Sequence, residues 1–142
     1  QVTYITSSNL DFDANTVSWV TPQLAITNMN GAQNAWGDND CYIVNTAAEL
    51  ITPCDYKIPV VPHQGEDFIR AALDSLAKLI HNLIEHNKSK VIVHCYAGME
   101  RSALTCVWYL VKYNNMSIDD AYELAQKARP IVLDRRSWLQ GD

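Results

Sequence analysis

The sequence is poor in glycine, proline and basic residues, and each shortage excludes a class of protein. Only 5 glycines and 5 prolines occur among 142 residues and no tract is dominated by one residue type, so no linker, repeat or low-complexity segment is expected. The net charge of -5 argues against a surface that coats nucleic acid or an anionic membrane, because such surfaces neutralise phosphates with Lys and Arg. No apolar run is long enough to cross a bilayer, and the N-terminus lacks a basic-then-apolar leader. We therefore expect one domain over residues 1–142, monomeric, with no nucleic-acid or membrane partner.

Cysteines are few and are not arranged as metal ligands. The four, Cys41, Cys54, Cys95 and Cys106, form no Cys-x-x-Cys pair and no grouping with histidine at the spacing of a zinc site. Two disulfides remain possible on the count alone, but a chain that is 48% hydrophobic does not need covalent staples. We expect free thiols in a reducing compartment, the cytoplasm, and neither a metal nor another cofactor.

The first half of the chain contains short apolar segments typical of strands. "WVTPQLAI", residues 19–26, predicts extended segments broken at Pro22, and "CYIVNT", residues 41–46, predicts a buried strand. "YKIPVV", residues 56–61, predicts another strand, with Pro59 marking an edge or a strand end. A sheet therefore begins early in the chain.

The second half contains helical patterns around one strongly apolar segment. Apolar residues spaced as one helix face predict a helix between residues 68 and 84, and "KVIVH", residues 90–94, predicts a central strand. A helix predicted at about residues 101–112 is apolar nearly all round and hence buried, and Ser117 begins a further helix through Ala128. These patterns predict an α/β fold: a small single-domain sandwich with a central, mostly parallel sheet flanked by helices.

The stretch "VIVHCYAGMERSA", residues 91–103, places a thiol and a guanidinium six positions apart where the strand becomes a helix. A loop between strand and helix can point successive amides at one spot, and the helix N-terminus adds partial positive charge, so the loop favours an anion. Gly98 permits the backbone angles of such a loop, and the planar fork of Arg101 can grip two phosphate oxygens. The same donors would stabilise Cys95 as a thiolate and lower its pKa. The stretch predicts a nucleophile aimed at a bound phosphorus.

Two neighbours of this loop support the nucleophile. Ser102 can donate a hydrogen bond to the sulfur of Cys95, which helps the thiolate leave when water hydrolyses a phosphocysteine. His94 stands at the end of the predicted strand, where it could orient the backbone or tune the thiolate, although a buried histidine of the core is the alternative. We assign His94 a supporting position behind the nucleophile.

"HCYAGMERS" resembles the signature His-Cys-x5-Arg-Ser of the cysteine-dependent protein tyrosine phosphatase superfamily, and Ser after the arginine is similar to its dual-specificity branch. The resemblance covers most of the chain, because four other segments also resemble segments of that family. They are "WVTPQLAITN", "IVNTAAEL", "YKIPV" and "SALTCVWYLVKYNNMSIDDAYELAQKARP". It implies a phosphorylated protein as substrate and a phosphocysteine intermediate on Cys95. It also implies that the phosphate is bound by the loop residues Tyr96, Ala97, Gly98, Met99, Glu100 and Arg101.

The family pattern is broken at the general acid. Members of the family protonate the leaving oxygen with an aspartic acid soon after the "IPV" strand, where this sequence has Pro62. Asp67 is the first choice for a displaced acid, although it could instead be a solvated residue at a helix start. The alternatives are Glu66, His63 and Asp55, or no acid at all. Loss of the acid would penalise alkyl phosphates most, because phenol is the better leaving group.

The leading hypothesis is a metal-independent phosphatase that acts on protein Tyr and on Ser or Thr. The acidic Glu100 in the loop disfavours the highly charged inositol lipids. The alternative is a phosphate-binding module with little turnover, which the missing acid would favour. A sulfur- or arsenate-handling enzyme fits poorly, because no second working cysteine is evident.

Overall fold

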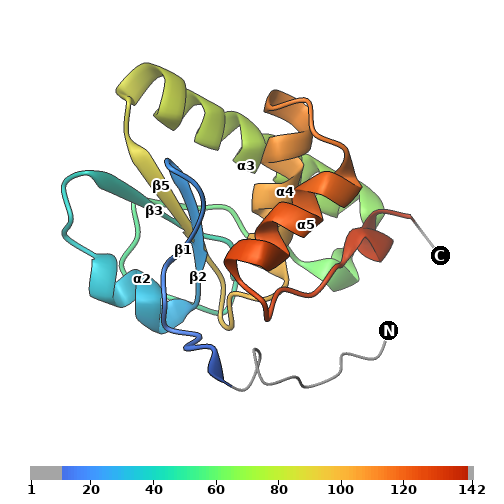
Figure 1. Ribbon diagram of the computed structural model, residues 1–142. Helices are drawn as coiled ribbons and strands as arrows, with labels where there is room; N and C mark the ends of the chain where they lie inside the picture. The colour runs from blue at the N-terminus through green and yellow to red at the C-terminus, as the bar shows by residue number, and fades with distance from the viewer. Residues whose placement is uncertain (1–10, 141–142) are drawn as a thin grey trace.

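The computed structural model describes residues 11–140 and contains a five-stranded sheet in the order β1-β2-β5-β3-β4 (Figure 1). β1 pairs antiparallel with β2, whereas β2, β5, β3 and β4 follow one another as parallel neighbours. The predicted mostly parallel sheet is therefore confirmed, with β5 at its centre. The strands are β1 Ser18–Thr21, β2 Leu24–Thr27, β3 Cys41–Asn45, β4 Tyr56–Lys57 and β5 Lys90–His94.

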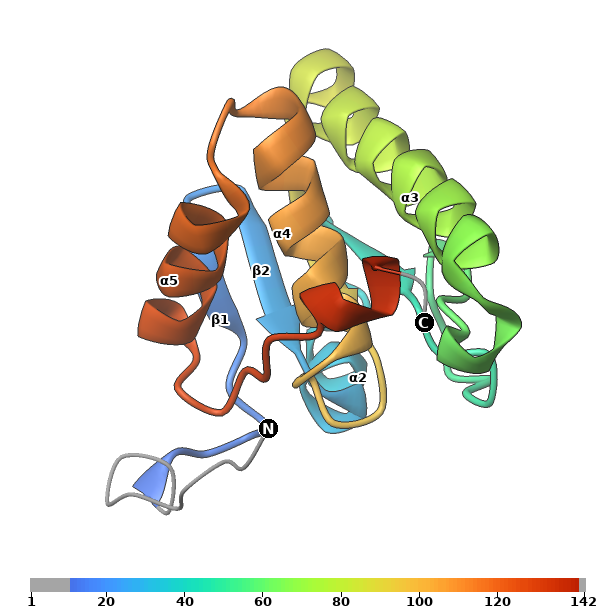
Figure 2. The same cartoon turned by 90° about the vertical axis from the view of Figure 1, so that its right-hand side faces the viewer.

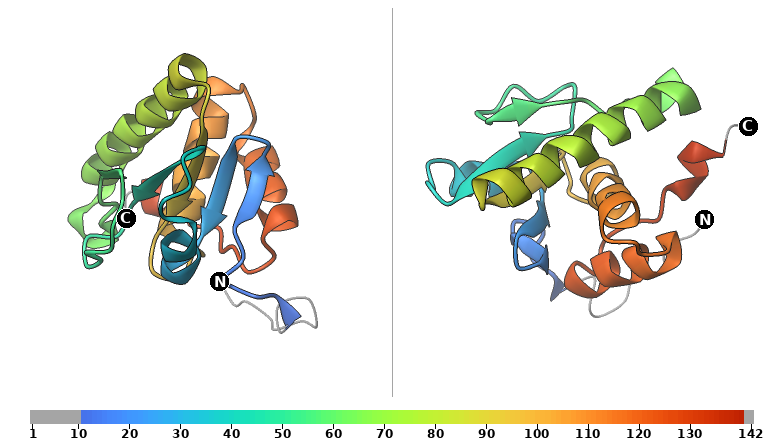
Figure 3. Two further views of the ribbon diagram at one scale, coloured as in Figure 1. Left: turned by 90° about the vertical axis from the view of Figure 1, so that its left-hand side faces the viewer. Right: turned by 90° about the horizontal axis from the view of Figure 1, so that it is seen from above.

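Helices flank the sheet unequally. Figure 2 shows α4 between α3 and α5, and the left view of Figure 3 shows the strands in front of α4 and α5. The short α2 packs on the opposite face, because its Ala32 contacts the second core described below. The helices are α2 Met29–Ala35, α3 Glu66–Asn87, α4 Arg101–Tyr113 and α5 Ile118–Ala128, with single 3-10 turns at η1 Pro62–Gln64 and η2 Arg136–Leu139.

Alternate residues of the central strands bury opposite faces of the sheet. Val91 and Val93 enter the main core under α3, α4 and α5, whereas Ile92 between them joins the smaller core beneath α2. In β2, Leu24 and Ile26 likewise face the main core. Because both faces of the sheet are covered, β5 is apolar on both faces from residue 91 to residue 93, which explains why "KVIVH" predicts a central strand.

The helix boundaries follow local capping chemistry. The Ser117 hydroxyl accepts a hydrogen bond from the Asp120 amide at 3.0 Å, which confirms the predicted start of α5. Glu66 and Asp67 occupy the first turn of α3, where carboxylates favour the positive end of the helix dipole. α3 ends at Lys88, whose left-handed backbone (φ 56°) closes the last turn.

Two elements differ from the prediction. β4 is limited to Tyr56–Lys57, because Pro59 has no amide hydrogen to continue the ladder. Backbone hydrogen bonds continue beyond it, since Ile58 donates to the last residue of β3 and Val60 to the residue after it. α2 was not predicted, because its 7 residues are too few to show a helical period. It is stabilised instead by Asn28, whose side chain accepts from the Gly31 amide at 2.8 Å.

All four cysteines are free thiols, as predicted. Within residues 11–140 no three His, Cys, Asp or Glu side chains gather as a metal site would require. No helix in this part of the chain is both long enough and apolar enough to span a membrane.

Candidate active site

The loop between β5 and α4 has all its carbonyl groups bound on its outer side. The carbonyls of residues 95–101 each accept a hydrogen bond from a group outside the loop or from the helix that follows. In chain order the donors are His94 Nδ1 at 3.3 Å, Met29 N at 3.1 Å, Arg129 Nη2 at 3.3 Å, Arg129 Nε at 2.7 Å, Leu133 N at 2.9 Å, Leu104 N at 2.9 Å and Thr105 Oγ1 at 2.8 Å.

This carbonyl arrangement fixes the direction of the loop amides. In a trans peptide the N–H points opposite to the C=O, so carbonyls held outward leave the amides facing the inside of the loop. Gly98 makes the turn possible with φ +69°, a conformation that L side chains rarely adopt. Inward amides with the N-terminus of α4 at the end of the loop are the arrangement that an anion cradle requires.

The Cys95 sulfur lies under this cradle. Its side chain is only 2% exposed, and the Ser102 hydroxyl lies 3.3 Å from Sγ. Burial by itself would raise the pKa of the thiol. Hydrogen bonds from the Ser102 hydroxyl and from the Ser102 and Gly98 amides, together with the charge of Arg101, outweigh burial and hold the pKa of Cys95 below its ordinary value.

His94 supports the loop from behind. The ring is fully buried, and Nδ1 lies 3.3 Å from the Cys95 carbonyl, which can only accept, so Nδ1 carries the proton. Burial lowers the pKa of His94 despite this hydrogen bond, which keeps the imidazole neutral. Its Nε2 has no hydrogen-bond partner among residues 11–140.

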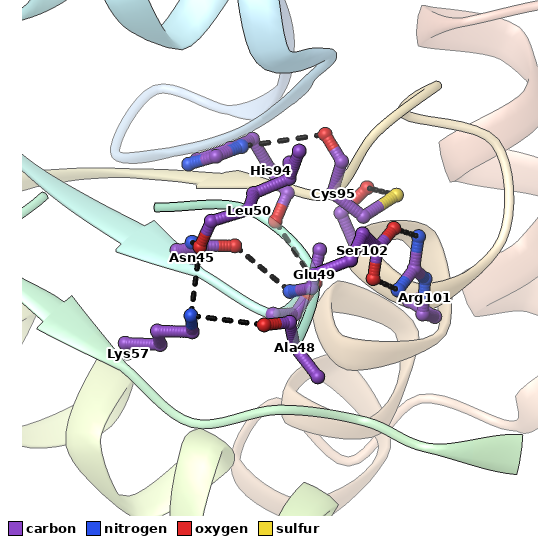
Figure 4. A network of polar contacts seen from close by, with 11 residues as sticks. Asn45, Ala48, Glu49, Leu50, Lys57, His94, Cys95, Arg101 and Ser102 are labelled. Atoms are coloured by element: carbon purple, nitrogen blue, oxygen red, sulfur yellow. Dashed lines mark hydrogen bonds and ion pairs between the residues drawn. The ribbon is translucent and has the colours of Figure 1, made fainter. Parts of the chain in front are cut away.

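Arg101 is held by a residue that the sequence reading missed. Its Nη1 and Nη2 each donate to one carboxylate oxygen of Glu49 at 2.7 Å, as Figure 4 shows. This bidentate contact lowers the pKa of Glu49 to about 2. Glu49 comes from the segment after β3, 52 positions before Arg101, so no local motif connects the two.

A cavity of about 460 Å³ opens beside Arg101. Apart from Arg101 and Glu49, its lining is largely apolar and comes from the segments after β3 and β4. His63 stands at its wall, next to Pro62, the position at which the resemblance led us to expect an acid. The lining residues are Ala48, Glu49, Val60, Val61, Pro62, His63 and Arg101.

Of the four candidate acids, the structure brings His63 alone to the wall of this cavity. Asp67 is exposed on the first turn of α3 and is not among the lining residues, so the geometry does not favour the first choice. Glu66 is ion-paired with Arg70 at 2.8 Å. Asp55 accepts a hydrogen bond from the Ile43 amide at 2.8 Å, away from the cavity.

The side chains on the outer side of the loop make contacts away from the cavity beside Arg101. Tyr96 is 60% exposed and, with Met99, lines a separate hollow of about 260 Å³ beside Asn28 and Met29. Glu100 pairs with Arg135 at 2.6 Å, so its charge is partly neutralised outside the cavity beside Arg101. The expected contribution of residues 96–100 to phosphate binding therefore rests on their amides.

Comparisons with known proteins agree with this geometry. The model of the dual specificity phosphatase catalytic domain matches residues 20–140. Mouse dual specificity protein phosphatase 18 is 32% identical over 123 residues, covering 82% of this chain and 65% of the relative. Human dual specificity protein phosphatase 21 is 36% identical over 98 residues, covering 63% of this chain and 49% of the relative. The chain thus spans less than two thirds of the length of these relatives.

Solved structures show the same fold. The crystal structure of human DUSP28 superposes with a TM-score of 0.73 at 23% identity, covering 87% of this chain and 90% of that one. The Cydia pomonella PTP-2 phosphatase has a TM-score of 0.75 at 16% identity, covering 89% and 87%. With the family model matching most of the chain, and the Cys95 loop in place between strand and helix, this protein belongs to the dual specificity phosphatase family.

Proposed function

We propose that this protein hydrolyses phosphate monoesters on protein Tyr, and on Ser and Thr, through a phosphocysteine on Cys95. The observation that carries the proposal is the sulfur of Cys95 under the loop amides, with the Ser102 hydroxyl 3.3 Å away. The thiolate attacks phosphorus, an S–P bond forms, and the P–O bond to the leaving group breaks. Water then attacks phosphorus and releases phosphate, while the Ser102 hydrogen bond stabilises the departing thiolate.

Arg101 and the loop amides stabilise the charge on the equatorial phosphate oxygens. Glu49 accepts from one N–H of Nη1 and one of Nη2, so the Nε–H and the second hydrogen on each terminal nitrogen remain as donors for the phosphate. No step in this sequence calls for a metal or another cofactor. A thiolate is easily oxidised, so the nucleophile requires reducing conditions, which favours a location in the cytoplasm. We expect this protein to be a monomer and to bind a phosphorylated protein as its substrate.

The group that protonates the leaving oxygen is the part of the site that departs most from the family pattern. We place His63 first, because it lines the cavity next to Arg101, and retain Asp67 as the alternative that the sequence predicted. Phosphotyrosine needs this proton least, since phenolate is a good leaving group. The apolar wall formed by Val60, Val61 and Pro62 also suits an aromatic ring, so we expect phosphotyrosine to be the better substrate.

The decisive experiment replaces the nucleophile. Cys95→Ser should abolish hydrolysis of an aryl phosphate, by at least about three orders of magnitude, while tungstate binding survives. In the wild-type protein, vanadate should inhibit and EDTA should have no effect. Full activity in Cys95→Ser would contradict the mechanism.

A phosphate-binding module with little turnover is the second candidate, and Pro62 at the acid position favours it. Such a protein would release about one equivalent of phenol in a burst and then stop, because the phosphocysteine would persist. Rapid-mixing kinetics with an aryl phosphate separate the two. Linear turnover over many equivalents supports the phosphatase.

A further inference from the structure

Arg129 is a fully buried arginine directly after α5, behind the Cys95 loop. Its guanidinium donates only to neutral oxygens, and no ion pair of Arg129 is found within residues 11–140. Burial lowers its pKa to about 10, which still leaves the group cationic at neutral pH. The Phe12 ring covers it, with the guanidinium carbon 5.3 Å from the ring centroid.

Two of its nitrogens hold the loop. Nε donates to the Gly98 carbonyl at 2.7 Å and Nη2 to the Ala97 carbonyl at 3.3 Å. The Ala97 carbonyl shares a peptide plane with the Gly98 amide, and the Gly98 carbonyl shares one with the Met99 amide. Because the Gly98 amide is one of the donors that stabilise the Cys95 thiolate, Arg129 sets the direction of a catalytic amide without touching the sulfur.

Nη1 and a second hydrogen bond from Nη2 anchor Arg129 to the edge strand β1 and to the segment before it. Nη2 also donates to the Ala14 carbonyl at 2.7 Å, and Nη1 donates to the Thr16 carbonyl at 2.9 Å and to the Ser18 hydroxyl at 3.1 Å. The fit to the loop is tight, since a Cβ on Gly98 would lie 2.6 Å from Nη2. Arg129 therefore ties the loop rigidly to the segment that leads into β1.

The charge of Arg129, like its hydrogen bonds to the loop, favours the ionised form of Cys95. A buried cation without a carboxylate partner is costly, and a nearby anion reduces that cost. The other titratable groups around Cys95 are Arg101 on α4, the neutral His94 on β5 and the buried thiol of Cys106 on α4. Arg129 thus adds a second, fully buried positive charge that interacts with the sulfur, besides that of Arg101.

We propose that Arg129 is a positioning residue that aims the Gly98 and Met99 amides into the anion cradle and favours the ionised form of Cys95. This inference rests on the proposed function for its importance to catalysis. The experiments that test this inference do not require the protein to turn over a substrate.

The first test compares Arg129→Lys with Ser18→Ala. Lysine keeps the cation but cannot hold two adjacent carbonyls in one plane, whereas Ser18→Ala removes one anchoring hydrogen bond and leaves both loop contacts. Alkylation of Cys95 by iodoacetamide is followed against pH by peptide-resolved mass spectrometry, which separates it from the other thiols. We expect the midpoint to rise by about one pH unit in Arg129→Lys and tungstate binding to weaken about tenfold, with little change in Ser18→Ala.

A folded Arg129→Lys protein with an unchanged midpoint and unchanged tungstate binding would overturn the inference. Equal shifts in both variants would also overturn it, because they would indicate a general loss of packing. If Arg129→Lys does not fold, the wild-type protein supplies the test. Its Arg129 Nε–H signal in NMR should exchange slowly and should titrate together with Cys95, and this titration should vanish in Cys95→Ser; an Nε–H signal indifferent to Cys95 would refute the proposal.

These outcomes are distinct from failure of the proposed function. A wild-type protein that is alkylated as a thiolate and binds tungstate, but does not turn over, would contradict the phosphatase and leave the role of Arg129 intact.

Discussion

At the scale of single residues, the charge of Glu49 offsets part of the positive charge that Arg101 offers to a phosphate. Its carboxylate is half exposed and engages both terminal nitrogens of the guanidinium. Glu49→Gln should therefore tighten tungstate binding and lower KM for an aryl phosphate by about two- to fivefold, the range expected for an exposed ion pair. Inhibition and initial-rate measurements check this. A rise in KM would show instead that Glu49 holds Arg101 in a productive position.

Protonation of Glu49 extends the same reasoning to acid solution. Because the pair lowers the pKa of Glu49 from about 4.5 to about 2, its contribution to stability is complete above pH 4.5 and is lost as the pH falls toward 2. Near neutral pH the carboxylate is always charged, so its effect on the charge of Arg101 is constant there.

The acid is tested with two matched variants. His63→Asn should reduce turnover of an alkyl phosphate by at least about tenfold and leave an aryl phosphate with a good leaving group nearly unaffected, since only the poor leaving group needs a proton. Asp67→Asn is the matched variant. The sequence predicts that it lowers turnover of a poor leaving group by about one to three orders of magnitude, whereas the exposed position of Asp67 predicts little change in turnover. An impaired Asp67→Asn beside an unimpaired His63→Asn would restore Asp67 as the acid.

At the scale of elements, α5 matters because it delivers Arg129 to the loop. The Ser117 side chain caps its first turn. Ser117→Ala should lower the free energy of unfolding by about 1 kcal/mol, the usual value of such a cap, as measured by urea denaturation. Activity of the folded protein should be unchanged at low temperature, because the Arg129 end of the helix is capped separately. A loss of activity without a loss of stability would contradict this separation.

Sequence reasoning succeeded for elements with a period or a local signature. The helix over residues 68–84 and the strand over residues 90–94 repeat apolar residues often enough to be recognised, and the Cys95 loop carries its chemistry within seven positions. The short α2 offered no such repeat.

The rest of the site could not be predicted for a different reason. Glu49 and Arg129 reach the loop from positions 52 and 31 residues away from their partners, so only tertiary structure shows them together. The choice among the candidate acids also depends on tertiary structure, because Asp67 at the start of a helix is exposed whereas His63, four residues earlier, lines the cavity.

At the scale of the whole molecule, a buried neutral histidine makes stability depend on pH. The pKa of His94 is lowered by burial, so the unfolded chain takes up a proton before the folded protein does. The contribution of His94 is therefore complete above its ordinary pKa of 6.5 and falls, by at most about 1.4 kcal/mol per pH unit, as the pH drops below that value.

Urea denaturation at several pH values checks this dependence. His94→Asn retains a donor for the Cys95 carbonyl but does not titrate, so its stability should change less between pH 6.5 and pH 5 than that of the wild-type protein. Parallel curves for the two proteins would assign the acid sensitivity to other groups.

The contact between Glu49 and Arg101 also sets the charge that an incoming anion meets at this site. Because Glu49 is a tethered monoanion beside the guanidinium, we expect a doubly charged group to gain more from the remaining N–H donors of Arg101 than a singly charged group does. A phosphate monoester is doubly charged at neutral pH, so we expect it to bind more tightly than a phosphodiester or a free carboxylate.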